Sequence, residues 1–221
     1  MRYLLTTLTL FITTLVTFPV QAKKIQLEAH RPIYLGLADY NESEYKNVEF
    51  QISFKSRLLW DIYGAYTQKS FWDTYAPSAP FREHNHNPEI YWEREGFSFG
   101  YEHESNGVDA DDRRSWERVY TKYEQTFAMM TVSGKTWMSF FTHENRDIPK
   151  YFGTWETAVH FDLQKIKLDL VNRIKSSIVR ITWDFGDFAA FFSSRNGYGH
   201  SGMIRYDEPT YSTIGGIALV Y

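Results

Sequence analysis

Residues 154–163 read TWETAVHFDL, and this stretch decides the fold class. Every second residue from Trp155 onward is Trp, Thr, Val, Phe or Leu, whereas the residues between them are Glu, Ala, His and Asp. Side chains alternate between the two faces of a β-strand, so one face of this segment is apolar and the other is mostly polar. Such an alternation, bounded by turn residues, predicts a strand that lies between two different environments.

The same period of two recurs from about residue 31 to the end of the chain. The segments expected as strands are 31–40, 47–56, 58–69, 88–95, 96–105, 115–126, 127–133, 135–144, 153–163, 165–175, either 177–185 or 187–195, and 211–221. Around a closed sheet this pattern gives an apolar outside and a polar lumen. We therefore predict an all-β, single-domain, 12-stranded antiparallel transmembrane β-barrel over residues 23–221. A soluble β-sandwich is the alternative, because it could also end in a strand such as 211–221.

The amino-acid composition fits a membrane protein that crosses with strands. Aromatic residues make up 18% of the chain, including 16 Tyr and 17 Phe, and barrels place such residues in girdles at both membrane interfaces. There are no cysteines, which excludes disulfide bonds and thiolate metal sites. The formal charge of −3 excludes a strongly basic nucleic-acid-binding protein, so no nucleic-acid partner is expected.

Residues 1–22 have the pattern of a cleaved secretory signal peptide. A short basic start precedes an apolar stretch over residues 4–20, and Val20 and Ala22 place small residues at the −3 and −1 positions of a cleavage site. A membrane anchor is the alternative, but the apolar stretch is short for a spanning helix and ends at the cleavage site. We expect a barrel that is exported to the outer membrane.

A chemical signal lies in the segment that ends at Ser105. Phe97, Phe99 and Tyr101 alternate with small or acidic residues, so this aromatic face is expected to meet lipid, and His103 and Ser105 continue it outward. Their spacing of two puts an imidazole beside a hydroxyl, where the histidine can accept the serine proton as a general base. A shift of one residue in register would turn both side chains into the lumen, which is the structural alternative.

The next strand offers a carboxylate that could orient this imidazole. If the two strands form a hairpin with His103 opposite Glu117, then Ser105 lies opposite Ser115 and residues 106–114 form the loop. Opposed side chains lie about 4.5–5.5 Å apart at Cβ, within reach of a carboxylate–imidazole hydrogen bond. The hairpin would bring together a nucleophile, a base and an orienting acid: Ser105, His103 and Glu117.

The loop after Ser105 combines a glycine with three carboxylates. Gly107 would leave its backbone N–H free to bind the oxyanion of a reacting ester. Asp109, Asp111 and Asp112, together with backbone carbonyls, suit a hard cation such as Ca²⁺. The loop is not an EF-hand, because the twelfth position counted from Asp109 is Tyr120 rather than Glu. A solvated acidic turn is the alternative.

At these residues the sequence resembles the outer membrane phospholipase A family of Gram-negative bacteria. The matching stretches, in family order, are YTQKSFW at 66–72, PFRE at 80–83, GYEHESNG at 100–107, RSWERVY at 114–120 and NGYG at 196–199. The resemblance runs from about residue 60 to the C-terminus. It implies a twelve-stranded barrel in the outer membrane that hydrolyses the acyl esters of phospholipids.

The resemblance also implies roles for individual residues. Ser105 would be the nucleophile, His103 the base and Gly107 the oxyanion amide. Calcium would help to polarise the ester oxygen through a bound water, in an active homodimer with Gln68 buried at its interface. The positions that match the calcium ligands are Ser78, the carbonyls of Val108 and Ala110, and Arg113.

Two positions depart from the family pattern. Glu117 stands where the family usually has Asn as its third catalytic residue, and a carboxylate should stabilise an imidazolium better than a neutral amide. Arg113 stands where a hydroxyl normally binds calcium, and a guanidinium cannot bind a cation. Neighbouring carboxylates could compensate, and these are Asp109, Asp111 and Asp112.

We predict a calcium-dependent serine hydrolase that cleaves phospholipids and lysophospholipids, with phospholipase A1 and A2 activity. The departures at Glu117 and Arg113 keep an alternative open, a non-enzymatic structural or channel-forming barrel. His84 and His86 have the spacing of a metal clip, but we expect them in a turn between Pro80 and Pro88, where a metal site is the less favoured reading.

Overall fold

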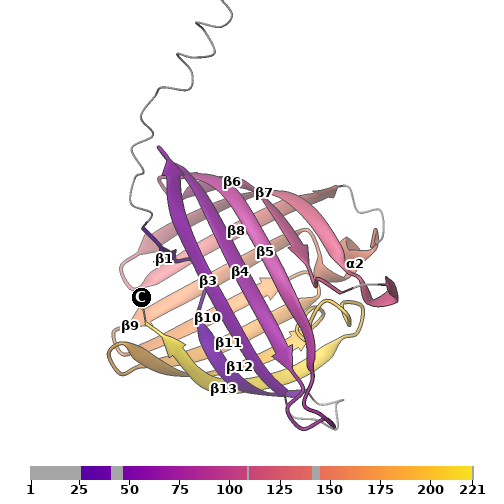
Figure 1. The fold of residues 1–221 in the computed structure, drawn as a ribbon. Coiled ribbons are helices and arrows are strands. Elements are labelled where there is room, and N and C mark those ends of the chain that lie inside the picture. The colour runs from indigo at the N-terminus through magenta and orange to yellow at the C-terminus, as the bar shows by residue number, and fades with distance from the viewer. Residues whose placement is uncertain (1–25, 41–46, 109, 141–144, 221) are drawn as a thin grey trace, which may run out of the picture.

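The computed structural model describes residues 26–40, 47–108, 110–140 and 145–220. The expected signal peptide at 1–22 lies outside the described residues. The described part is almost entirely antiparallel β-sheet, wrapped into a barrel (Figure 1). In the part of the chain that is described, no helix has the length and apolar character needed to span a membrane.

Thirteen strands and two short helices follow one another within the described residues. The strands are β1 (Glu28–Ala29), β2 (Tyr34–Tyr40), β3 (Asn47–Leu59), β4 (Ile62–Trp72), β5 (Phe81–Arg94), β6 (Phe97–Ser105), β7 (Ser115–Phe127), β8 (Met130–Phe140), β9 (Trp155–Leu163), β10 (Ile166–Arg173), β11 (Ser176–Asp184), β12 (Phe188–Gly197) and β13 (Thr210–Leu219). The helices are η1 (Ala110–Asp112) and α2 (Ile148–Phe152).

The sheet closes because β3 pairs with β2 on one side and with β4 on the other. From β2 the order runs through β13, β12 and so on back to β4, each strand antiparallel to its neighbours. The two-residue β1 pairs with Phe54 and Lys55 of β3, beyond the stretch that pairs with β2, and so occupies the same position in the wall as β2. The barrel therefore has twelve strand positions, as the sequence predicted.

Three details of the strand prediction were wrong. Residues 127–133 and 135–144 were expected as two strands, but the turn lies at 128–129 and a single strand, β8, follows it. Segments 177–185 and 187–195 were treated as alternatives, but each contains a strand, β11 and β12. The strand expected at 88–95 begins at Phe81, because both faces of residues 82–87 are polar and hide the hydrophobic alternation.

The two ends of the barrel differ in their connections. At one end, tight turns join the strands, and these lie at 60–61, 95–96, 128–129, 164–165 and 185–187. Longer connections, among them 73–80, 106–114 and 198–209, lie at the other end together with α2. Outer-membrane barrels have short periplasmic turns and longer extracellular loops, so the long-loop end is the external one.

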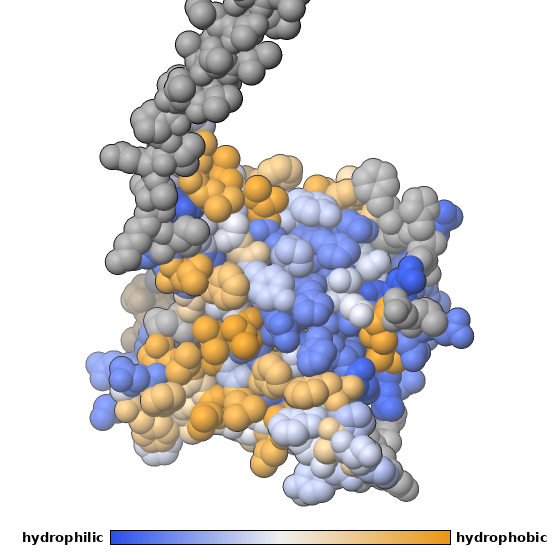
Figure 2. Space-filling model, viewed as in Figure 1, coloured by the Kyte–Doolittle hydropathy of each residue, from blue (hydrophilic) through white to orange (hydrophobic). Residues whose placement is uncertain are grey.

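The outer surface carries large apolar side chains that a protein in water would bury. Leu37, Ile52 and Phe99 are 63%, 46% and 53% exposed. Aromatic rings gather near the short-turn end at Trp60, Trp92, Phe97, Tyr123, Phe127, Phe185 and Phe188, and near the long-loop end at Trp72, Phe81, Phe140, Trp155 and Tyr211. Figure 2 shows hydrophobic residues to the left of and below a hydrophilic area in the middle of the near face. Two aromatic belts around an apolar band are typical of a barrel in lipid.

Two networks of buried charges lie in the lumen. In the first, Glu49 accepts hydrogen bonds from Arg195 at 2.8 and 2.9 Å, lies 3.2 Å from Lys69, and also binds the hydroxyls of Tyr34 and Tyr40. The charges are complementary, so the buried carboxylate of Glu49 is satisfied by groups from strands that are distant in sequence.

The second network is built around Glu102. Its carboxylate contacts Arg118 at 3.0 Å, Lys135 at 2.9 Å and Arg31 at 3.0 Å. Arg31 continues to Glu89 at 3.1 Å, which ties the segment before β2 to the opposite strands. A carboxylate that is 1% exposed and has three cationic partners cross-links four separate segments of the wall.

The long connections fold over the external end of the lumen. Buried side chains of this lid, namely Ile148, Phe152, Met203 and Tyr206, form a hydrophobic cluster with Trp116 of β7. The buried His200 also belongs to the lid; burial and the nearby cations lower the pKa of its imidazole to about 3, so it is neutral and donates to the Asn196 carbonyl at 3.2 Å. The loop end of the barrel is therefore packed rather than open.

Replacing Arg195 by Met should destabilise the barrel by about 3 kcal/mol, because Glu49 then loses its bidentate partner while it stays buried. Unfolding by urea in lipid vesicles, followed by tryptophan fluorescence, measures the difference. Arg94→Met is the control, since Arg94 is 64% exposed beside Glu95, and it should change stability by less than about 0.5 kcal/mol. Equal midpoints for the two variants would contradict a structural role for the lumen network.

Candidate active site

The hairpin of β6 and β7 has the register that the sequence suggested. His103 lies opposite Glu117, and Ser105 lies opposite Ser115. The Nδ1 of His103 lies 3.2 Å from Oε1 of Glu117, and both side chains are half-buried, at 31% and 21% exposure. Because an ionised carboxylate only accepts hydrogen bonds, Nδ1 carries the proton in this pair and Nε2 is left as an acceptor.

These side chains face outward, away from the lumen. Their neighbours in sequence point inward and are buried: Glu102 is 1% exposed and Trp116 is 0% exposed. Phe99 and Tyr101, on the same face as His103, are exposed on the outer surface. The alternative register, with the polar pair in the lumen, does not occur.

Ser105 lies at the end of β6, where the strand meets the long loop. Its side chain is half-buried and shares the outer face with His103, two residues before it. Among the described residues, the structure has no hydrogen bond between the Ser105 hydroxyl and the His103 ring. Contacts between a nucleophile and its base are often long in ligand-free structures and shorten when substrate binds.

A break in the ladder between β5 and β6 lies directly behind His103. The two strands pair at His86↔Ser105 and resume at Glu89↔Glu102. Pro88 has no backbone N–H to give to β6. The buried Asn87 compensates, because its Nδ2 donates to the His103 carbonyl at 2.7 Å. An inward side chain thus holds the backbone of the candidate base.

The loop after Ser105 is organised by Asn106, which is 2% exposed. Its Nδ2 donates to the carbonyl of Asp112 at 2.7 Å, and its Oδ1 accepts from the N–H of Arg114 at 3.0 Å. Gly107 follows with φ at +63°, a backbone conformation that favours glycine. The loop therefore leaves Gly107 at the surface beside Ser105.

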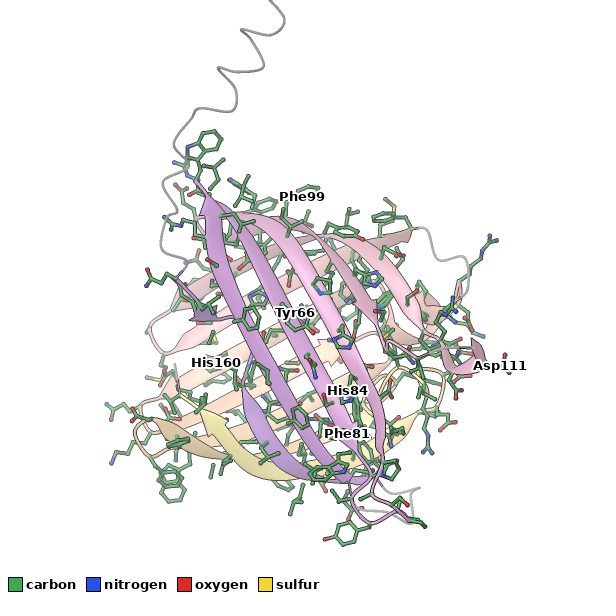
Figure 3. The ribbon with its side chains drawn as sticks, viewed as in Figure 1. Tyr66, Phe81, His84, Phe99, Asp111 and His160 are labelled. Carbon is green, nitrogen blue, oxygen red and sulfur yellow. The ribbon has the colours of Figure 1, made fainter. Side chains whose placement is uncertain are left out.

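The calcium positions expected from the sequence lie on two loops at the external end. Ser78 is exposed on the connection between β4 and β5, with φ at +66°. Val108 precedes η1, which begins at Ala110, and Asp109 lies outside the described residues. The side chains of Asp111, Asp112 and Arg113 are exposed, and Figure 3 shows Asp111 at the loop end of the barrel.

Two carbonyls of this loop are already engaged within the protein. The Asp111 carbonyl accepts from Nη1 of Arg114 at 2.7 Å, and the Asp112 carbonyl accepts from Asn106. Within the described ranges, no three His, Asp or Glu side chains are grouped so that they could hold a metal. A cation here would have to be held by hydroxyl and carbonyl oxygens, and Ser78, Val108 and Ala110 are the predicted positions with that chemistry.

The structure adds a row of outward polar side chains on β4 and β5, next to Ser105. We call it the polar stripe: Tyr66, Gln68, Ser70, His84 and His86. The hydroxyl of Tyr66 lies 2.6 Å from Nδ1 of His86, and that of Ser70 lies 2.8 Å from Nδ1 of His84 and 3.1 Å from Nε2 of Gln68. Figure 3 shows Tyr66 and His84 in the middle of the near face, where Figure 2 is hydrophilic.

The expectation that His84 and His86 lie in a turn was wrong, since both are in β5. The sequence holds a signal that could have placed both histidines in a strand. The even-numbered residues of 66–70 and 84–86 continue the outward face of the neighbouring apolar segments. Polar residues at outward positions are rare in lipid because each costs free energy unless it is paired, so they indicate a functional surface.

Comparison with known families decides the assignment. The sequence model of a family described as phospholipase A1 matches residues 19–219. The chain belongs to the phospholipase A1 family, a family of enzymes. Phospholipase A1 of Proteus vulgaris is 28% identical over 203 residues, which cover 78% of this chain and 70% of that protein.

The phospholipase A1 of Escherichia coli strain K12 is 32% identical over 147 residues. That alignment covers 57% of this chain and 51% of the relative, so the chain aligns with about half of that protein's length.

Solved structures support the same fold. The outer membrane phospholipase dimer of Salmonella typhi with bound calcium has a TM-score of 0.81 at 23% identity, covering 90% of this chain and 94% of that one. Outer membrane phospholipase A of Escherichia coli also has a TM-score of 0.81, at 22% identity and with 88% and 94% coverage. The porin NanC has a TM-score of 0.56 at 6% identity, covering 86% of this chain and 100% of that one, so the barrel architecture extends beyond this family.

Asn106→Ala should loosen the loop between β6 and β7, because the Asp112 carbonyl and the Arg114 N–H both lose their partner. Limited proteolysis of the refolded barrel should then cut within residues 106–114 much faster than in the wild type. Asp111→Ala removes an exposed carboxylate from the same loop and should leave the cleavage rate unchanged. Equal rates for wild type and Asn106→Ala would show that the loop is held by other contacts.

Proposed function

We propose that this protein is a phospholipase of the outer membrane, a serine hydrolase that cleaves the acyl esters of phospholipids and lysophospholipids at both the A1 and A2 positions. The observation that carries the proposal is the His103–Glu117 pair beside Ser105 on the lipid-facing surface. Membership of the phospholipase A1 family supplies the reaction class.

Glu117 would hold the imidazole of His103 with Nδ1 protonated, so that Nε2 can accept the proton of the Ser105 hydroxyl. The serine oxygen attacks the ester carbonyl and forms a tetrahedral intermediate with a negatively charged oxygen. The N–H of Gly107 donates to that oxygen. His103 then protonates the leaving alkoxide, and a water molecule that is activated in the same way releases the fatty acid.

The position of the site suits a substrate that never leaves the membrane. Ser105 lies at the strand end near the long loops, which is the external end, and its side chain points outward. Phe99 and Tyr101 on the same face can contact acyl chains, while the ester and headgroup lie level with the loops. The substrate would therefore be a lipid of the outer leaflet.

Calcium would be held at the external loops by the hydroxyl of Ser78 and the carbonyls of Val108 and Ala110. When bound, it would polarise the ester oxygen and stabilise the charge that develops there. Arg113 does not fit as a ligand, because a guanidinium offers only donors. The exposed carboxylates of Asp111 and Asp112 lie on the same loop and would complete the oxygen set, which Asp109 could also join.

The active form would be a homodimer that pairs the polar stripe of two barrels. Gln68, at the centre of the stripe, faces outward with its amide hydrogen-bonded to Ser70. In lipid such groups gain from covering one another, and a second barrel would also complete a wall for the acyl chain. The related outer membrane phospholipase of Salmonella typhi is described as a dimer with bound calcium.

An inert or channel-forming barrel is the competing function. The buried ion pairs across the lumen and the packed lid disfavour a channel. The replacement of the usual amide by Glu117 does not favour an inert barrel either, because the carboxylate keeps its hydrogen bond to His103.

Ser105→Ala should abolish the release of fatty acid from phospholipid in mixed micelles, because the nucleophile is lost. Ser115→Ala is the matched control: Ser115 lies directly opposite on the same face, and its loss should leave the rate within about twofold of wild type. Activity that survives Ser105→Ala would rule out the proposed catalytic set. An inactive wild type at every calcium concentration would support the inert barrel.

Removing calcium with EGTA should lower the rate of fatty-acid release by at least about tenfold, and adding CaCl₂ should restore it. Sedimentation of the same samples in detergent should show that the active fraction sediments as a dimer. Full activity in EGTA, or an active species that sediments as a monomer, would contradict the calcium or the dimer part of the proposal respectively.

A further inference from the structure

We infer that His86 is a second oxyanion donor, placed across the strand from the nucleophile. The inference rests on the proposed hydrolase function and adds a catalytic residue to it. No role was expected for His86 from the sequence, beyond its spacing from His84.

The first observation is position. His86 on β5 is the direct partner of Ser105 on β6, so the two side chains leave neighbouring backbones on the same outer face. Directly opposed side chains lie about 4.5–5.5 Å apart at Cβ. An ester carbonyl attacked by Ser105 would therefore lie within reach of the His86 ring.

The second observation is the direction of the ring. A Cβ placed on Gly107 would lie 3.5 Å from Cδ2 and 3.6 Å from Nε2 of His86. The Nε2 edge of the imidazole thus faces Gly107, whose backbone N–H is the proposed first donor. Two donors close together beside the nucleophile are what an oxyanion hole requires.

The third observation concerns which nitrogen of the His86 ring carries the proton. The Tyr66 hydroxyl lies 2.6 Å from Nδ1 of His86 and 3.3 Å from the amide oxygen of Gln68. A phenol has one proton, and the imidazole nitrogen is both the nearer and the more basic acceptor. Nδ1 then accepts from Tyr66, and the ring proton lies on Nε2, which can donate to the developing oxyanion.

The roles of the two histidines are therefore opposite. The Nδ1 of His103 donates to Glu117, which leaves its Nε2 as a base. The Nδ1 of His86 accepts from Tyr66, which makes its Nε2 a donor. In the reaction, the Ser105 proton moves to His103 as the serine–carbon bond forms, while the hydrogen bond from His86 strengthens as charge moves onto the carbonyl oxygen. No proton leaves His86 in this step.

The test compares His86→Leu and His86→Gln with wild type in detergent micelles. Leucine suits a lipid-facing position, and Tyr66 keeps Gln68 as an acceptor, so the barrel should fold. We expect His86→Leu, assayed on the fraction that sediments as a dimer, to lower kcat about 10²-fold with little change in KM, because the donor acts on the transition state. Glutamine can still donate, so His86→Gln should recover a substantial part of that loss. His160→Leu, a histidine paired with Asp169 on the other side of the barrel, is the control.

A second readout separates catalysis from support of the fold. A long-chain trifluoromethyl ketone forms a tetrahedral oxyanion with the serine, so its affinity should fall in His86→Leu by about the same factor as kcat/KM. If kcat and ketone affinity of His86→Leu both stay within about threefold of wild type, while Ser105→Ala is inactive, His86 is not a donor and the hydrolase assignment stands. If the wild type releases no fatty acid, or Ser105→Ala remains active, both proposals fail.

Discussion

Every backbone N–H and C=O group of a chain in lipid needs a partner within the protein, because the hydrocarbon offers none. The closed antiparallel sheet meets this demand, and β3, which pairs with β2 on one side and β4 on the other, closes it. Closure then divides every strand into an outward and an inward face. The apolar outer surface, the charged lumen and the outward position of the site all follow from that division.

The inward face does more than the outward face to specify the register of the strands. A lipid-facing leucine is equally stable at any position within the apolar band, because lipid surrounds all of them. The band therefore does little to fix the register of the strands. The networks around Glu49 and Glu102 do fix it, because each carboxylate meets cations from several strands and would be costly to bury alone. A rigid wall of this kind can hold Ser105, His103 and Glu117 in place from behind.

The site lies where the regular pattern is interrupted. Pro88 breaks the ladder beside His103, Asn87 replaces the missing donor from within the lumen, and β6 ends at Ser105. On the outer face, the polar stripe replaces apolar side chains at the same level. Each interruption would be unfavourable in a purely structural barrel, and together they surround one serine. In our proposal, the two histidines that flank it hold their protons on opposite nitrogens, because one faces a carboxylate and the other a phenol.

A period of two is a local property, so the sequence was enough to predict the barrel. The expected number of strand positions was correct because one strand too many near 127–133 offset one too few near 177–195. The pairing of His103 with Glu117 was a supposition from sequence, and the hairpin register confirms it. The sequence did not determine the strand that contains His84 and His86, because polar residues on both faces of residues 82–87 conceal the alternation there. Only the tertiary structure placed His86 opposite Ser105 and Tyr66 beside His86, since those contacts join different strands. It also decided which charges meet in the lumen: Glu49 and Arg195 are far apart in the chain and adjacent only because the barrel closes.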